Sequence, residues 1–145
     1  MGWGEKIQHL THADIDRLFR EWEQRVASKD RWFSEASFQF SDNGEHRELK
    51  VTRCLTDPAL GYLVLHTTTD GTQCRTLESG AAEGTVEVED SANDAHVVKR
   101  SYMVAEEVAK QAVHYFSKTG REDPSLNWVT YEEVDPQYIS SEHVT

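Results

Sequence analysis

Apolar residues near the N-terminus recur with the period of an α-helix. They follow the spacing i, i+3, i+4, i+7 and i+11, with charged residues between them, which draws one apolar stripe. The members of this stripe are Ile15, Leu18, Phe19, Trp22 and Val26. Thr11 and Asp14 both precede the stripe, and Asp14 lies three positions after Thr11. The two residues form a shortened capping box. The pattern predicts a helix from Thr11 to about Ser28.

A second apolar stripe with the same period lies between residues 101 and 119. Its members are Ala105, Val108, Ala109, Ala112 and Phe116. Lys118 suits the negative end of a helix dipole, and Gly120 is a candidate for the left-handed residue that ends a helix. Pro124 prevents the helix from resuming. A short extended segment follows, and we expect its Trp128 to pack into the core under this helix.

Between the two helices the period of apolar residues changes from 3.6 to 2, which is typical of β-strands. Six strand segments are predicted, at residues 33–40, 48–51, 62–67, 72–77, 85–88 and 95–100. Asn43-Gly44 and Asp70-Gly71 indicate tight hairpin turns, because such pairs accept positive φ angles. The segment 62–67 is apolar on both faces, so we expect it at the centre of the sheet.

The predicted elements are therefore a helix, a run of strands, a second helix and a final strand. Strands joined by hairpins, with helices before and after them, indicate the α+β class. We expect an antiparallel sheet of about six to seven strands, with both helices packed on one face and the Trp128 strand added to the sheet. Residues 1–145 are expected to form one domain, with 1–10 as a loosely ordered lead-in and 135–145 as a loosely ordered tail.

Composition narrows the classes of partner. The net charge of −11 argues against binding free nucleic acid, which needs a basic surface, and permits binding to a basic protein. No apolar run has the length of a membrane span, and the N-terminus has no signal-peptide core, so we expect a cytoplasmic protein without membrane contact. Cys54 and Cys74 are too few for a disulfide framework and are expected to be reduced.

The sequence carries no local motif for catalysis or metal binding. It contains no HExxH, no glycine-rich phosphate loop, no GxSxG elbow and no HxE…PCxxC zinc deaminase pattern. Seven histidines are scattered over separate predicted elements, and each is expected to be a structural or surface residue. We therefore expect a protein that is not an enzyme and that uses no metal and no cofactor.

The segment from Val104 to Trp128 is similar to the closing region of a known family. VAEEVAKQAVHYFSKTG, then a polar turn with proline, then LNW, resembles the signature of the first immunity-protein family of bacterial polymorphic toxin systems. Members are small α+β proteins with an N-terminal helix, a run of strands, a late helix and a terminal strand that carries tryptophan. The resemblance implies that the chain binds and neutralises a cognate toxin domain inside the producing cell. Deaminases are the toxins associated with this family.

Acidic residues are concentrated in the segment 78–94, which contains no lysine or arginine. A toxin that modifies nucleic acid presents a basic cleft, and an acidic inhibitor can cover this cleft after fast, charge-steered association. An aromatic anchor is also expected, because tyrosine is frequent at binding hot spots. The residues expected to bind the partner are Glu83, Glu87, Glu89, Asp90, Tyr131, Glu132 and Glu133.

Two other functions stay open on the sequence alone. One is a non-catalytic regulatory or adaptor domain that binds a small ligand or another cellular protein. A ligand pocket between the helices and the sheet would favour it. The other is an enzyme whose histidines are brought together by the fold. A cluster of His66, His114 and a carboxylate in one cleft would favour that hypothesis.

Overall fold

The computed structural model describes the chain over residues 10–27, 34–42, 44–55, 57–68, 73–80, 83–89 and 94–134. Residues 1–9 of the expected lead-in and the expected tail, 135–145, lie outside these described residues. Leu10, the last residue of the expected lead-in, is buried in the core.

The order of helices and strands confirms the expected α+β class. The helices are α1 (His12–Ala27) and α2 (Glu106–Thr119). The strands are β1 (Glu35–Asp42), β2 (Glu45–Arg53), β3 (Tyr62–Thr67), β4 (Cys74–Leu77), β5 (Thr85–Glu89), β6 (Ala95–Lys99), β7 (Met103–Val104), β8 (Trp128–Thr130) and β9 (Glu133–Val134). Two short 3₁₀ turns are η2 (Pro58–Leu60) and η3 (Arg100–Tyr102).

The strands form two antiparallel sheets rather than the single sheet that we expected. The main sheet has the order β1-β2-β3-β4-β8, and the two-residue strand β7 also pairs with β3. The small sheet has the order β5-β6-β9. The strand that begins at Trp128 joins the main sheet beside β4, as the sequence predicts. The sequence pattern identified these strands except the two-residue strands β7 and β9, and it carries no information about which strands pair.

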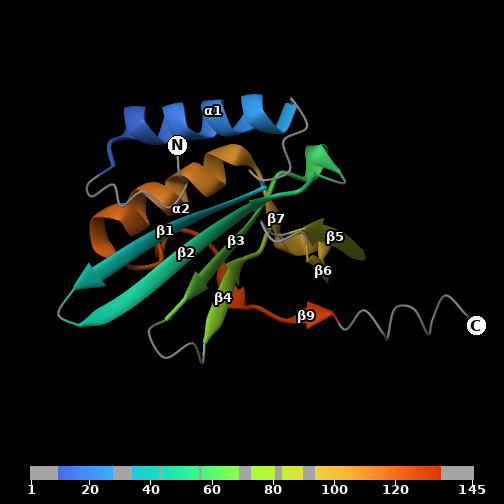
Figure 1. The fold of residues 1–145 in the computed structure, drawn as a ribbon. Coiled ribbons are helices and arrows are strands. Elements are labelled where there is room, and N and C mark those ends of the chain that lie inside the picture. The colour runs from blue at the N-terminus through green and yellow to red at the C-terminus, as the bar shows by residue number, and fades with distance from the viewer. Residues whose placement is uncertain are drawn as a thin grey trace, which may run out of the picture.

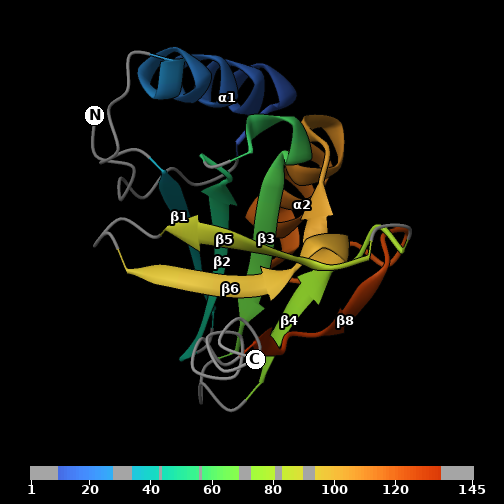
Figure 2. The ribbon, with the colours of Figure 1, turned by 90° about the vertical axis from the view of Figure 1, so that its right-hand side faces the viewer.

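The molecule has three layers. Both helices lie on one face of the main sheet, and the small sheet covers the other face (Figure 1). Figure 2 shows β5 and β6 running across the strands of the main sheet. Along β3, Tyr62 and Val64 belong to the helix-side core, whereas Leu63 and Leu65 belong to the core under the small sheet. β3 is therefore covered on both faces, as its apolar sequence predicts.

Helix α1 begins at the predicted capping box. The N–H of Asp14 donates to Oγ1 of Thr11 at 3.1 Å, and the N–H of Thr11 donates to Oδ2 of Asp14 at 3.0 Å. Two N–H groups at the helix start are thereby satisfied. The apolar stripe then faces the main sheet, and its buried members are Ile15, Leu18, Phe19 and Trp22.

Helix α2 begins later than the sequence suggested. Residues 100–104 form η3 and β7, because the backbone of 103–104 pairs with β3. Ala105, expected in the buried stripe, is the exposed N-cap residue. The end of the helix agrees with the sequence. Gly120 is left-handed with φ +68°, and its N–H donates to the carbonyl oxygen of Phe116 at 2.7 Å.

Arg53, at the end of β2, links α1 to the main sheet. Its guanidinium donates to both carboxylate oxygens of Glu23 on α1, at 2.7 and 3.0 Å. It also donates to the carbonyl oxygens of Pro58 and Gly61, at 2.6 and 3.2 Å. The hydroxyl of Tyr62 donates to the same Glu23 carboxylate at 2.8 Å. Arg53 is only 9% exposed, so it needs both this counter-charge and these acceptors. The network therefore favours one position of α1 on the sheet.

Replacing Glu23 by Gln removes the counter-charge of a buried guanidinium. We expect the free energy of unfolding to fall by about 1–3 kcal/mol, less than for a fully buried pair, because the Glu23 side chain is 33% exposed. Tyr62→Phe, which keeps the ion pair and loses one hydroxyl, is the matched control, with an expected loss of about 1 kcal/mol. Urea unfolding measures both. A loss for Glu23→Gln no larger than the loss for Tyr62→Phe would contradict this role for the ion pair.

Gly120→Ala is expected to destabilise the chain much more than Gly44→Ala. Both glycines have positive φ, +68° and +81°, so alanine costs about 1–2 kcal/mol at either position. At Gly120 the added methyl group would also overlap the ring of Phe40, whereas nothing lies within 4 Å of it at Gly44. The expected loss is therefore about 3–5 kcal/mol at Gly120. Equal shifts of the unfolding midpoint in urea for the two variants would show that Phe40 moves aside freely.

Candidate partner-binding surface

The small sheet brings together two acidic segments that are far apart in the sequence. β6 lies between β5 and β9, so that Glu87 is opposite Val97 and Val97 is opposite Val134. Val86 and Val88 are buried beneath the sheet, and Glu87 between them is exposed. The acidic residues of β5 and β9 therefore lie on neighbouring strands of one small sheet (Figure 1), with Glu87 on its outer face and Glu133, opposite the buried Val98, on the face toward the main sheet.

Five of the six carboxylates expected at the partner surface are described. Glu83, Glu87, Glu132 and Glu133 are exposed and Glu89 is half-buried. The sixth, Asp90, lies outside the described residues. A lysine also lies on this sheet, since Nζ of Lys99 is 3.8 Å from Oε2 of Glu132. The described part of the small sheet is therefore predominantly acidic.

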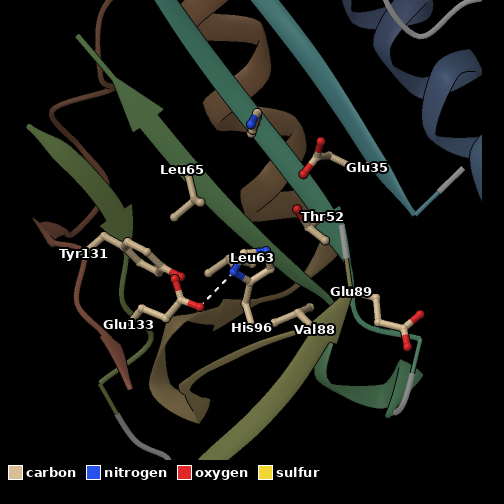
Figure 3. A pocket seen from close by; sticks show the side chains of 10 residues that line it. Glu35, Thr52, Leu63, Leu65, Val88, Glu89, His96, Tyr131 and Glu133 are labelled. Carbon is tan, nitrogen blue, oxygen red and sulfur yellow. Dashed lines mark hydrogen bonds and ion pairs between the residues drawn. The ribbon is translucent and has the colours of Figure 1, made fainter. Parts of the chain in front are cut away.

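A cleft of about 150 Å³, here called the inter-sheet cleft, lies between the two sheets (Figure 3). β1, β2 and β3 of the main sheet form one wall, and the small sheet with the residue Tyr131 forms the other. The lining residues are Glu35, Lys50, Thr52, Leu63, Leu65, Val88, Glu89, His96, Tyr131 and Glu133. Three residues that the sequence assigned to partner binding, Glu89, Tyr131 and Glu133, therefore line one cavity.

Tyr131 forms part of the cleft wall rather than a fully exposed anchor. It is half-buried, and its ring lies 5.7 Å from the ring of Tyr102, centroid to centroid. Burial raises the pKa of Tyr131, and the nearby carboxylate of Glu133 raises it further, so the phenol keeps its proton above the ordinary tyrosine pKa of about 10. Glu133 also pairs with His96, with 2.8 Å between Oε1 and Nδ1 (Figure 3). The cleft thus combines an aromatic wall with a carboxylate that is already oriented.

The sequence analysis missed the polar cleft residues contributed by the main sheet and by β6. These are Glu35, Lys50, Thr52 and His96. A signal was present in β2, where Leu49 and Val51 pack in the helix-side core and the alternate positions must face the other way. That alternation could place Lys50 and Thr52 on the outer face. It could not show that a second sheet covers this face.

The histidine cluster that would favour an enzyme is not formed. Nδ1 of His66 lies 2.9 Å from Oε2 of Glu122, and Nε of Arg75 donates to the same carboxylate at 3.0 Å. The ring of His114 instead stacks on His12, with 3.6 Å between centroids. Within the described part of the chain no hydrogen bond or ring contact joins His66 to His114.

Other candidate chemistry is limited in the part of the chain that the structure describes. There, no group of three or more histidine, cysteine, aspartate or glutamate side chains is arranged to hold a metal ion. Cys54 is buried, Cys74 is half-buried, and both are free thiols. Among these same residues no helix has the length and apolar character needed to cross a membrane.

Comparison with known proteins adds no assignment to this geometry. Neither protein-family models, nor curated proteins, nor solved structures match the chain. What the chain does must therefore follow from its own residues and their arrangement.

Tyr131→Phe is expected to reduce the loss of stability at alkaline pH. The folded chain holds the Tyr131 proton above the ordinary pKa of about 10, where the unfolded chain releases it. Stability is therefore unaffected by this group below about pH 10. Above that pH it falls, by up to about 1.4 kcal/mol per pH unit for one tyrosine. Burial raises the pKa of Tyr62 as well, so the variant keeps part of the loss.

Urea unfolding of the wild type and of Tyr131→Phe between about pH 8 and pH 11 measures this difference. The wild type should lose more stability than the variant above pH 10. Glu133→Gln offers a second measurement, because removing the carboxylate should lower the pKa of Tyr131 in an ultraviolet titration of tyrosinate. Parallel stability curves for the wild type and Tyr131→Phe would contradict the burial of this phenol.

Proposed function

We propose that this chain is an immunity protein, a non-catalytic protein that binds a cognate bacterial toxin domain in the cytoplasm of the producing cell. The toxin is a basic nucleic-acid deaminase, and the immunity protein covers its substrate cleft. The observation that carries the proposal is the gathering of carboxylates from two remote segments on the small sheet. The order of elements also supports it, because the resemblance of the segment 104–128 implies the same order.

The charge of the chain suits a partner that itself binds nucleic acid. A deaminase acting on a polyanion needs a basic cleft, and this chain has a net charge of −11. Glu87 and Glu132 stand exposed on or beside the outer strands of the small sheet, where a basic surface can approach them. Opposite potentials can raise association rates to about 10⁸–10⁹ M⁻¹s⁻¹ at low salt. Fast capture matters when the partner is lethal to the cell that makes it.

The inter-sheet cleft suits a protein partner better than a free metabolite. Its volume of about 150 Å³ is below the range of roughly 300–1,000 Å³ that is usual for small-molecule pockets. The regulatory-domain alternative would be favoured by a pocket between helices and sheet. This cleft lies instead on the opposite face of the main sheet, next to the exposed acidic residues.

Co-expression with the toxin domain encoded beside this protein's gene tests the proposal. Wild-type protein should restore growth, and it should form a one-to-one complex with a catalytically inactive toxin. The double variant Glu83→Lys, Glu87→Lys should slow association at least about 10-fold, because the new charges repel a basic surface. Both residues are exposed, so the fold should be retained.

Glu107→Lys is the matched control, since Glu107 is an exposed acid on α2, on the other side of the main sheet. Surface plasmon resonance on the three proteins gives the association rates. If the wild type fails to protect cells from the neighbouring toxin, the immunity function is rejected. If it protects and the double variant associates normally, the small sheet is not the contact surface.

A further inference from the structure

We infer that the inter-sheet cleft receives one arginine side chain of the toxin domain, and that this arginine anchors the complex. The inference rests on the proposed function for the identity of the partner. It adds that the recognised feature of the partner is an arginine side chain and that the contact is made in the inter-sheet cleft. The acidic surface around the cleft would attract the partner, and the cleft would fix its position.

The size and the floor of the cleft suit one long side chain. A cavity of about 150 Å³ holds a group the size of benzene, which is comparable to a single large side chain. Leu63 and Leu65 of β3 and Val88 of β5 supply apolar surface from both sheets. The methylene stem of an arginine can bury itself against such surface while its charged end reaches polar groups.

The charges in the cleft select a cation. Three glutamates from three different strands, Glu35, Glu89 and Glu133, line the cleft together with one lysine, Lys50. In Figure 3, Glu133 lies toward one end of the cleft and Glu35 and Glu89 toward the other. A cationic group entering the cleft would meet a counter-charge at Glu133, whereas an anionic group would be repelled by the same carboxylate.

One end of the cleft has the groups that favour arginine over lysine. Tyr131 offers an aromatic ring, on which a planar guanidinium stacks better than a compact ammonium group. Glu133 lies beside it in the lining, and His96 holds Oε1 of this carboxylate at 2.8 Å. Oε2 makes no hydrogen bond within the described residues, so it can accept one from the partner. Arginine is also among the residues most enriched at binding hot spots.

Two variants of the cleft test the inference with the inactive toxin domain as the binding partner. Leu65→Trp fills the cavity. Glu133→Gln keeps the shape of the cavity and the hydrogen bond from residue 133 to His96, and it removes one charge. Each is expected to raise the dissociation constant at least about 10-fold, mostly through faster dissociation. Glu107→Gln, on α2, should change the constant by less than about two-fold. Thermal unfolding checks that each variant folds. If Leu65→Trp does not fold, the dissociation constant of Glu133→Gln decides the outcome.

An arginine scan of the toxin identifies the occupant. One arginine-to-alanine variant of the toxin should bind the wild-type chain much more weakly than the unchanged toxin does. The same toxin variant should bind Glu133→Gln almost as well as the unchanged toxin does, since both changes remove the same contact. If the toxin binds the wild type and both cleft variants equally, or if no toxin arginine couples to Glu133, the inference is wrong and the immunity function stands. If the toxin does not bind the wild type, both fail together.

Discussion

β3 buries both of its faces, and the rest of the architecture depends on this constraint. Tyr62 and Val64 point into the helix-side core, and Leu63 and Leu65 point to the opposite side. A sheet whose central strand is apolar on both faces needs an apolar cover on each, because exposed apolar surface costs about 25 cal/mol per Å². The two helices supply one cover. The small sheet supplies the other, which is why the chain has three layers.

The need for this second cover explains where the acidic surface lies. In β5 the alternation that buries Val86 and Val88 necessarily turns Glu87 outward. β9 completes the small sheet from the other end of the sequence and brings Glu132 and Glu133 beside β6, with Glu133 on the face toward the main sheet. Acidic side chains on these outer strands also oppose pairing with the edge of another sheet. One short sheet thus covers a core and carries exposed carboxylates, and the inter-sheet cleft lies between this sheet and β1, β2 and β3.

Buried charges determine how the layers are positioned. Hydrophobic packing is not directional, so it tolerates sliding of α1 over the sheet, whereas the fork of Arg53 fits Glu23 in few arrangements. A similar link at the other end of the main sheet joins Arg75 and His66 to Glu122, in the segment after α2. These networks attach α1 and the segment after α2 to the main sheet, whose strands β1, β2 and β3 form one wall of the inter-sheet cleft. A partner that binds there meets a preorganised surface.

Local patterns in the sequence determined the two helices, the longer strands and their buried faces, but not the two-residue strands β7 and β9. The stripe of α1, its capping box at Thr11 and the glycine that ends α2 were all predictable, because each depends on residues within a few positions of one another. The acidic composition and the residues Glu87 and Glu133 were predictable in the same way, as candidates. Only the tertiary structure decided that β5, β6 and β9 leave the main sheet, that α2 begins at Glu106, and that Tyr131, Glu133 and His96 share a cleft with β2 and β3. Pairing between strands depends on contacts between residues far apart in the sequence. An alternating strand can pair with any strand whose apolar residues face the same side, so no local rule could choose among these strands.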